Sequence, residues 1–381
     1  MQGGARERDT MLTEREQQIL GWIRANPSIS QQEIADRAGI SRSSVSVHIS
    51  NLTKKGAILG RQYVLSDNPY VVIVGATNMD VVGKPGGILT PRDVTPGTIV
   101  VSPGGTARNV AHNLALLGSS TKLVTAFGED IRARELSEGC MGVNIDLEGS
   151  VTVPGGTTST CVFILDEHGD LSQAIADMGI LDSLTPSVLE RRLNLIDRAT
   201  ACFVDTNISR ESLRFLAEHV STPLFCDPVS TSKAAKLSGL LGHFHAIKPN
   251  ALEAEALTGL TIHDEKSLEL AAQKLLDTGI EQVFISLGAD GLLCAEQDRT
   301  LRLPSYNANV VSATGSGDAM MGAIIWAYLQ GEDLEGTCSA GLAVAAICTE
   351  SASTVNPNLT AETVRQRMEE AGVAGKPLSA S

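Results

Sequence analysis

The run Thr314-Gly315-Ser316-Gly317-Asp318 has the residue types and spacing for chemistry on a phosphate group. It lies between an extended stretch at 309–311 and an apolar helical stretch at 319–329, so its glycines should stand at a helix N-terminus. The first N–H groups of a helix have no partner within it and attract anions. Asp318 beside them is placed to accept the proton of a hydroxyl that attacks a phosphoryl group. Such turns also begin helices for structural reasons alone. The run therefore indicates a phosphate site only if other residues of the chain point to the same chemistry.

Polar residues suited to a small ring compound follow two other predicted elements. Asn78 and Asp80 come just after an apolar strand, and the glycine pair Gly104-Gly105 precedes a helix that carries Asn109. Open α/β sheets bind ligands at the carboxyl ends of their strands, where these residues are expected. Amide and carboxylate groups form paired hydrogen bonds to vicinal hydroxyls, and glycine lets a ring lie against the backbone. These residues predict a site for a polar ring.

Charge and a third cluster predict dependence on a metal ion. The first 65 residues carry nine basic and six acidic side chains, a net charge of +3, which leaves −17 for the rest of a chain whose total is −14. An acidic body repels an anionic nucleotide unless a cation or a nest of N–H groups offsets its field. Asn250 and Glu253, one helical turn apart, suit Mg²⁺ held through water.

Two common nucleotide-binding motifs are missing from the sequence of this domain. Neither a Walker loop nor a strand-linked GxGxxG is present near its start, which disfavours P-loop and dinucleotide folds.

Strand and helix patterns alternate from residue 70 onward. Strands are predicted at 70–75, 121–126, 200–205, 223–226, 244–247 and 282–286, with helical stretches between them. This alternation predicts an α/β domain over 70–375 with a doubly wound, mostly parallel sheet. Stretches around 81–103 and 151–176 interrupt the alternation and predict a small antiparallel β lid, its second part formed by 151–153, 159–165 and 171–175.

The first 65 residues predict a separate winged helix-turn-helix domain. A capping box at Thr13 and a cap at Ser30 begin two helices, and Ser41 begins a third over about 42–53. Two short extended runs around Gly60 follow, as in a β-wing. The segment 41–61 contains basic residues and no acidic one, as a surface that faces DNA phosphates requires. The candidate DNA contacts are Arg42, Ser43, Ser44, His48, Lys54, Lys55 and Arg61. A dimerisation or docking module remains the alternative.

Four motifs occur in the order typical of the ribokinase (phosphofructokinase-B) family, and residues 70–370 resemble it. They are the glycine pair followed by Asn109, the N-x-x-E run Asn250–Glu253, the segment Ser286-Leu-Gly288-Ala-Asp-Gly291, and the glycine run ending at Asp318. The resemblance implies a ribokinase-like fold and transfer of a phosphoryl group from ATP, with Mg²⁺, to a hydroxyl of a nucleoside or sugar.

The resemblance also implies roles for single residues. Asp318 is the expected catalytic base, and Gly315, Ser316 and Gly317 form the expected anion hole. ATP is expected at Asn250, Glu253, Ser286, Gly288, Gly291, Thr314 and Asn356, with Asn250 and Glu253 also organising Mg²⁺. The substrate is expected at Asn78, Asp80, Gly104, Gly105, Thr106, Asn109, Asp177 and Asn207. Ser312 stands where the family usually has an Asp that helps bind K⁺, which puts K⁺ activation in doubt.

Within the family, four segments look most like pseudouridine kinases: 104–109, 175–178, 205–209 and 226–230. This likeness implies phosphorylation of the 5′-hydroxyl of pseudouridine, with other nucleosides and free sugars as alternatives. For Asp177 and Asn207 taken alone, an ordinary turn residue is an equal interpretation. A second alternative is a DNA-binding regulator that uses the kinase fold as a ligand sensor, although the residues needed for catalysis are retained.

Composition limits the class of protein and the cellular compartment that can be expected. Hydrophobic residues make up 43% and aromatic residues 3% of the 381 residues, which predicts a well-buried enzyme and disfavours stacking on single-stranded nucleic acid. Seven scattered cysteines without metal-ligand spacing are expected as small core residues in a reducing cytoplasm. With no apolar run long enough to span a bilayer, no membrane association is expected. A homodimer is expected, because family members often dimerise through the lid and winged helices commonly bind as dimers.

Overall fold

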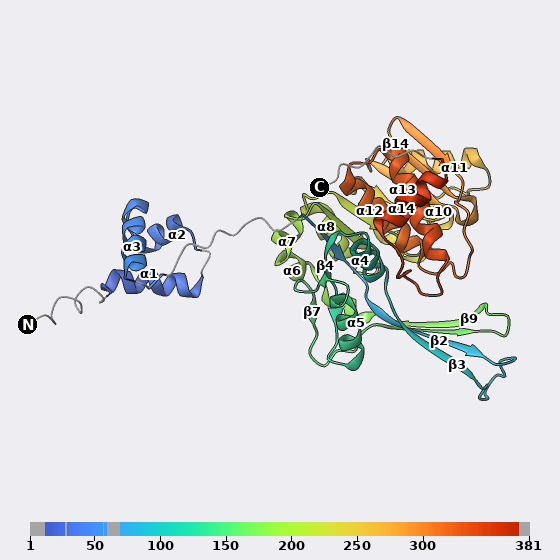
Figure 1. The fold of residues 1–381 in the computed structure, drawn as a ribbon, viewed down its shortest axis with the longest axis horizontal. Coiled ribbons are helices and arrows are strands. Elements are labelled where there is room, and N and C mark those ends of the chain that lie inside the picture. Colours follow the sequence, from blue (N-terminus) through green and yellow to red (C-terminus); the bar gives the residue numbers. More distant parts are fainter. Residues whose placement is uncertain (1–11, 27–28, 56, 59–68, 373–381) are drawn as a thin grey trace, which may run out of the picture. The chain divides into compact units, whose positions relative to one another are not determined.

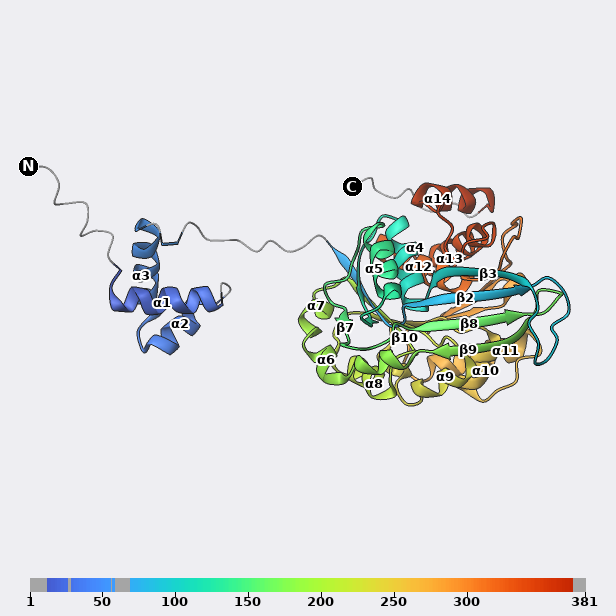
Figure 2. The same cartoon turned by 90° about the horizontal axis from the view of Figure 1, so that it is seen from below.

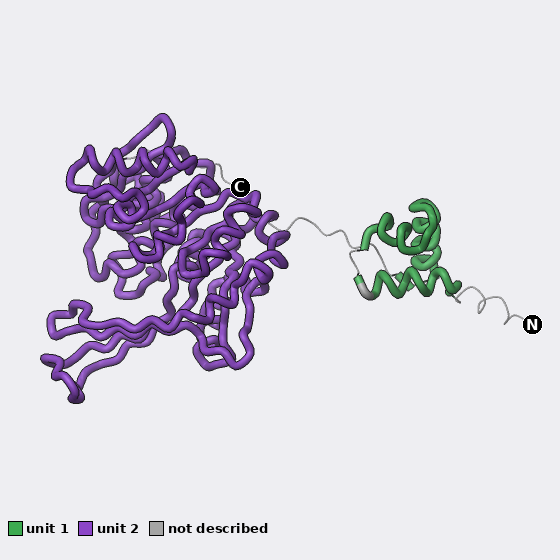
Figure 3. Tube along the Cα trace, turned by 180° about the vertical axis from the view of Figure 1, so that it is seen from behind, with its two compact units in different colours: residues 1–67 green, residues 68–381 purple. Residues whose placement is uncertain are grey.

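The computed structural model describes residues 12–26, 29–55, 57–58 and 69–372. The chain forms two compact units, Met1–Asp67 and Asn68–Ser381, shown in separate colours in Figure 3. Among the described residues, no helix combines the length and the apolar character needed to cross a bilayer. Each unit is described by itself below.

The N-terminal unit contains the three predicted helices: α1 (Glu14–Ala25), α2 (Gln31–Ala38) and α3 (Arg42–Lys54). The side chains of Thr13, Ser30 and Ser41 each accept a backbone hydrogen bond at a helix start, as predicted. A small core of buried side chains holds the helices together, formed by Ile19, Leu20, Ile34, Ala35, Val45 and Leu52. The predicted wing at 57–65 lies outside the described residues except for Ala57 and Ile58.

The C-terminal unit is built on a nine-stranded sheet with the order β15-β14-β13-β12-β11-β10-β1-β4-β6. All neighbouring strands are parallel except the pairs β13–β14 and β14–β15. The strands are β1 (Tyr70–Val74), β4 (Ser120–Val124), β6 (Ile145–Asp146), β10 (Ala201–Asp205), β11 (Leu224–Asp227), β12 (Ala246–Ile247), β13 (Gln282–Ser286), β14 (Leu292–Glu296) and β15 (Arg299–Leu303). The doubly wound, mostly parallel sheet is therefore confirmed.

Helices cover both faces of this sheet, as Figure 2 shows. One core cluster joins the sheet to α4 (Thr106–Leu116), α12 (Ser316–Gln330), α13 (Leu334–Thr349) and α14 (Ala361–Glu370), with α5 (Ile131–Met141) beside them. The other joins it to α6 (Pro186–Glu190), α7 (Leu193–Asp197), α8 (Arg210–His219), α10 (Ala251–Thr258) and α11 (Glu265–Leu276). The short helix α9 (Thr231–Ala234) precedes β12.

A separate four-stranded lid sheet projects from the C-terminal unit (Figure 1), with the order β3-β2-β8-β9. Its strands are β2 (Asn78–Pro85), β3 (Gly97–Gly104), β8 (Thr160–Leu165) and β9 (Leu171–Asp177). The pairs β2–β3 and β8–β9 are antiparallel hairpins, and β2 pairs with β8 in parallel. The prediction that 151–153 belongs to the lid is wrong, because β7 (Val151–Thr152) pairs with β5 (Ala126–Phe127) in a sheet of its own. A strand of two residues is too short to show the alternation of apolar and polar residues, so the strand with which it pairs could not be predicted from the sequence.

The cysteines differ from expectation at one place. Cys294 on β14 and Cys338 on α13 form a disulfide across 44 residues of sequence, whereas all seven cysteines were expected unpaired. Both are fully buried in the core between sheet and helix. Packing of α13 on β14 brings them together, and no local spacing in the sequence predicts that contact. The remaining five are free, and four of them are buried as predicted.

Candidate active site

The site lies where the sheet reverses its winding, at the carboxyl ends of β1 and β10. Asp205, the last residue of β10, is buried and accepts hydrogen bonds from the backbone N–H groups of Ala76 (2.9 Å), Ala107 (3.1 Å) and Asn207 (2.9 Å). A side chain at Gly75 would overlap its carboxylate, so the glycine makes room for it. Asp205 thus ties the loop after β1 to the first turn of α4, a role that the sequence did not reveal.

Four predicted substrate residues come together at the root of the lid. Asn78 and Gly104 are paired across β2 and β3, and Asn78 Nδ2 donates to Asp80 Oδ1 at 2.6 Å. A side chain at Gly104 would overlap Asp80, and Gly105 has φ +100° and lies against the backbone of Ala76. Burial raises the pKa of Asp80, while the hydrogen bond from Asn78 acts against this rise. This cluster presents a carboxylate and an amide to one space.

Asp318 is linked to α4 across 209 residues of sequence. Asn109 Nδ2 donates to Asp318 Oδ2 at 2.8 Å. Burial, followed by the nearby Asp227 carboxylate, raises the pKa of Asp318 to about 7, although the Asn109 hydrogen bond and Lys248 oppose the rise. A carboxyl group with this pKa is matched to proton transfer near neutral pH. The structure therefore gives Asp318 the environment of a general base.

Arg108, also on α4, contacts Asn109. Its side chain is 7% exposed, and its Nη1 donates to Asn109 Oδ1 at 3.1 Å. A guanidinium group only donates hydrogen bonds, so the atom facing it must be the amide oxygen. The amide nitrogen of Asn109 must then face Asp318. Arg108 occurs in the predicted substrate segment, but sequence reasoning gave it no role.

Lys248 is a second residue that sequence reasoning missed. It is 4% exposed and forms an ion pair with Asp227 at 3.0 Å. Burial lowers the pKa of Lys248, but the carboxylates of Asp227, Glu253 and Asp318 together outweigh it and the net shift is upward, so the ammonium stays charged. Its Nζ lies 3.4 Å from the position that a side chain at Gly317 would take. The glycine turn thus lies against a buried positive charge. In the sequence, only the position of Lys248 just before the Asn250 motif could have indicated this role.

The glycine turn begins α12 without a side-chain cap. Gly315 is the N-cap with φ +84°, and a side chain there would overlap the backbone oxygen of Thr354. Ser316 is the first helical residue, and its Oγ donates to Ala313 O at 2.9 Å. The N–H group of Ser316 donates to Ala313 O at 3.3 Å. The next N–H groups, of Gly317 and Asp318, are at a position where they lack partners within the helix. The turn can therefore bind an anion beside Asp318.

Asn250 and Glu253 form a capping box at the start of α10. Glu253 N donates to Asn250 Oδ1, and Asn250 N donates to Glu253 Oε2, each at 2.9 Å. Burial and the Asp227 carboxylate raise the pKa of Glu253. No group of three or more His, Cys, Asp and Glu side chains able to hold a metal occurs among the described residues. The carboxylates of Asp227, Glu253 and Asp318 surround the single ammonium group of Lys248. This excess of negative charge fits Mg²⁺, which keeps waters and takes further ligands from phosphates.

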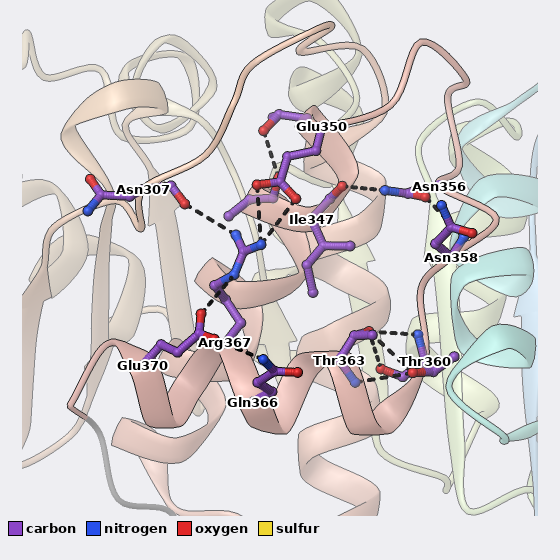
Figure 4. Close-up of polar contacts among 12 residues, drawn as sticks. Asn307, Ile347, Glu350, Asn356, Asn358, Thr360, Thr363, Gln366, Arg367 and Glu370 are labelled. Carbon is purple, nitrogen blue, oxygen red and sulfur yellow. Dashed lines mark hydrogen bonds and ion pairs between the residues drawn. The ribbon is translucent and has the colours of Figure 1, made fainter.

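The predicted ATP residues are partly assembled. Ser286 N donates to Pro249 O at 2.9 Å, which joins the end of β13 to Asn250. Gly291 has φ +91° and no room for a side chain beside Leu303, so its need for glycine is structural. Thr314 N donates to Ser312 Oγ at 3.2 Å. Figure 4 shows Asn356, whose Nδ2 donates to Ile347 O at 2.6 Å and whose Oδ1 accepts from Asn358 N at 3.0 Å. The last predicted ATP residue, Gly288, has φ +59° in a short turn after β13.

Two predicted substrate residues lie on different elements. Asn207 follows β10 at the winding reversal, and its Oδ1 accepts from Lys233 Nζ at 2.5 Å. Asp177 ends β9 opposite Thr160 and is exposed. Thr106 is the first residue of α4. Asn207 therefore lies with the core of the site, and Asp177 lies at the inner end of the lid strand.

The predicted DNA contacts divide by accessibility. Arg42, Ser43 and Lys54 are exposed, whereas Ser44 and His48 are half-buried. Lys55 pairs with the buried Glu16 at 2.8 Å, so it braces α3 against α1. Arg61 lies outside the described residues.

Comparison with known proteins agrees with both units. Residues 68–361 match the pfkB family of carbohydrate kinases, and residues 12–58 match a winged helix-turn-helix DNA-binding family. An Escherichia coli strain K12 protein described as an uncharacterized sugar kinase, YeiI, is 36% identical over 92% of this chain and 98% of its own length. A pseudouridine kinase of the same organism is 31% identical over 81% of this chain and 99% of its own.

A solved structure shows the same fold. An Arabidopsis thaliana ribokinase complexed with ribose and ATP superposes with a TM-score of 0.71 at 22% identity, over 80% of this chain and 99% of that one. The predicted ribokinase-like fold and the predicted helix-turn-helix are thus both confirmed. The chain belongs to the pfkB family of carbohydrate kinases, enzymes that transfer a phosphoryl group to an alcohol, and carries an N-terminal winged helix-turn-helix domain.

Proposed function

We propose that the kinase unit transfers the γ-phosphoryl group of ATP to the 5′-hydroxyl of a nucleoside, with pseudouridine as the first candidate. The observation that carries this proposal is Asp318. Its carboxyl group, with a pKa raised to about 7, lies at the uncapped start of α12 and is held by Asn109. A proton acceptor beside an anion-binding turn is the arrangement that phosphoryl transfer to a hydroxyl requires.

Each residue of the site has its own proposed role in the reaction. Because Asp318 Oδ2 accepts from Asn109, we assign Oδ1 to take the proton of the attacking hydroxyl. The N–H groups at the start of α12 and the ammonium group of Lys248 stabilise negative charge on the phosphoryl oxygens. Bound Mg²⁺ would neutralise further phosphate charge, with Asn250 and Glu253 holding it through water. Asn78 and Asp80 orient the sugar hydroxyls.

Two observations support a nucleoside rather than a bare sugar. The relative at 31% identity is a pseudouridine kinase, whereas the relative at 36% identity is described only as a sugar kinase. In the lid, Val82 pairs with Phe163 two residues beyond the pair formed by Asp80 and Cys161, so Phe163 and Asp80 share a face. An aromatic ring on the face that carries Asp80 suits contact with a planar base.

A phosphorylation screen tests the proposal. The full chain is incubated with ATP and MgCl₂ and, in parallel, with pseudouridine, uridine, other nucleosides, ribose or fructose, and products are identified by ³¹P NMR and mass spectrometry. We expect pseudouridine 5′-phosphate to form with the highest kcat/KM. A higher kcat/KM with a free sugar would reject the nucleoside assignment. The Asp318→Asn variant, purified in the same way, measures any contaminating kinase.

We further propose that the N-terminal unit binds duplex DNA through α3. The family match at 12–58 and the absence of acidic residues from α3, whose Arg42 and Lys54 are exposed, support this proposal. A mobility-shift assay with DNA from upstream of the coding sequence, with and without pseudouridine, should give a complex that weakens as salt rises. A ligand-dependent shift would favour a regulator. The absence of a complex would favour a docking module instead.

We also propose a homodimer that forms through the lid. Val81, Val101, Val162 and Ile175 lie directly opposite one another across its four strands, so they share one face, on which Val101 and Ile175 are 56% and 73% exposed. Asp80 lies on the opposite face, next in sequence to Val81. An exposed aliphatic face of this kind is typical of a protein interface. Light scattering of the full chain and of Ile175→Lys should show a dimer and a monomer, respectively.

A further inference from the structure

We infer that the centre of α3 recognises a thymine methyl group through Val47, an assignment that rests on the proposed binding of DNA. Val47 is 58% exposed and is the one exposed large apolar side chain among the described residues of the N-terminal unit. The core of this unit already has its apolar side chains elsewhere on α3, where Val45 and Leu52 are fully buried. Val47 therefore does not serve the packing of its own unit.

The neighbours of Val47 define the surface on which it lies. At 3.6 residues per turn, Ser43, Ser46, Val47, Ser50 and Lys54 fall on one stripe of α3. The three serines and Lys54 are exposed. The stripe thus consists of small hydroxyl groups around one aliphatic side chain, with positive charge at its end. It contains no acidic residue.

Duplex DNA is the partner that this combination fits. The second helix of a helix-turn-helix enters the major groove, where serine hydroxyls can pair with either donors or acceptors on base edges. The 5-methyl group of thymine is the apolar group that the major-groove edges present, and apolar side chains contact it. Arg42 and Lys54, near the two ends of α3, are placed for phosphates, which fix position and carry no sequence information.

The exposure of the side chains on α3 decides which of the DNA contacts predicted from the sequence belong to this stripe. Ser44 and His48 are half-buried, whereas Ser43 is exposed, although the Oγ atoms of Ser43 and Ser44 each lie 2.8 Å from Ser41 Oγ. Ser43 is retained from the residues proposed from the sequence. Ser46, Val47 and Ser50 are added to it by their exposure on the same side.

The test compares thymine with deoxyuridine, which differ by the methyl group alone. Duplexes that bind the full chain are selected from a random library, and each thymine of the consensus is then replaced by deoxyuridine. For the wild-type chain, one replacement should weaken binding about fourfold, the value for burying one methyl group. The Val47→Ala variant should bind the thymine duplex less tightly and should not distinguish it from the deoxyuridine duplex. Thermal unfolding of the variant checks that its fold is retained.

The Lys54→Ala variant is the matched control on the same stripe. It should weaken binding to all duplexes alike and lower the salt dependence by about one phosphate contact, while the thymine preference stays. Sequence-selective binding with no methyl effect, or with the same effect in Val47→Ala, would overturn the assignment of Val47 and leave DNA binding intact. Failure to enrich any duplex, with no salt-dependent binding, would overturn DNA binding itself.

Discussion

Two helices begin at the active site, and they begin in opposite ways. At the start of α10, Asn250 and Glu253 satisfy each other's backbone N–H groups in a complete capping box. At the start of α12, Gly315 is the N-cap and offers no side chain to accept a hydrogen bond. A capped helix uses its first N–H groups within the protein, whereas an uncapped one leaves them for a ligand. The comparison predicts that α12 binds the transferred phosphoryl group and that α10 serves mainly to position its own residues.

The other long helices support this distinction. Side chains of Asp130, Ser209, Asp264, Asp333 and Thr360 cap α5, α8, α11, α13 and α14, respectively. The helix α4 is intermediate, because its N-cap Gly105 has no side-chain bond but Asp205 of β10 accepts from Ala107 N. Among described helices of eight residues or more, α12 alone combines a glycine N-cap with no such distant carboxylate. That exception occurs beside the proposed base.

Asp318→Asn should have the largest effect. The substitution preserves shape and removes the proton acceptor, so turnover should fall by about 10² or more, within the range for general base catalysis. Nucleoside affinity should change little, because Asn78 and Asp80 remain in place. Steady-state kinetics give kcat, and equilibrium titration gives substrate affinity. Near-normal turnover would remove the main support for α12 as the catalytic helix.

Arg108→Met should shift the pH dependence of the reaction. Asp318 must be ionised to act as a base, so wild-type activity should rise as pH increases through about 7, the pKa of Asp318. Without Arg108 the Asn109 amide is free to turn, and the loss of its hydrogen bond should raise the pKa of Asp318. One hydrogen bond corresponds to about one pH unit. The acidic limb of kcat/KM against pH should therefore move to higher pH.

Arg108→Lys is the matched control, since it keeps a donor toward Asn109 and should keep most of the wild-type profile. Loss of a buried side chain also lowers stability, but lower stability alone does not move a pH limb. A Met variant with lower melting temperature and an unchanged pH profile would assign Arg108 to packing.

Asn250→Ala tests the capped helix. Removing an N-cap side chain costs about 1 kcal/mol of stability, which denaturant unfolding measures. Because Glu253 loses its partner, the Mg²⁺ concentration needed for half-maximal activity should also rise. Asp264→Ala removes the cap of α11 in the same way. It should cost similar stability with no change in Mg²⁺ requirement. Equal Mg²⁺ requirements in the two variants would limit Asn250 to capping.

Sequence patterns predicted the parts of the site that are local. The glycine turn, the pair Asn250 and Glu253 on one helical turn, and the Asn78–Asp80 cluster each depend on neighbouring residues, and each is assembled in the structure. The ion pair between Asp227 and Lys248 depends instead on strands β11 and β12 lying side by side. Asp205 likewise acts on a helix 98 residues away in the sequence. Such contacts follow from strand order, which no local pattern specifies.

The monovalent cation should have the smallest effect, because Ser312 lies where a carboxylate is usual in the family. Its Oγ already accepts a hydrogen bond from Thr314 N. A hydroxyl has no charge with which to bind a cation, so K⁺ should add nothing to the α12 turn. Turnover should be the same in KCl and in NaCl at equal ionic strength. Ser312→Asp restores the carboxylate and should make turnover depend on K⁺. Stimulation of the wild-type chain by K⁺ would show that backbone oxygens suffice without the carboxylate, and the loop before α12 would then bind a cation next to the anion held by the N–H groups of α12.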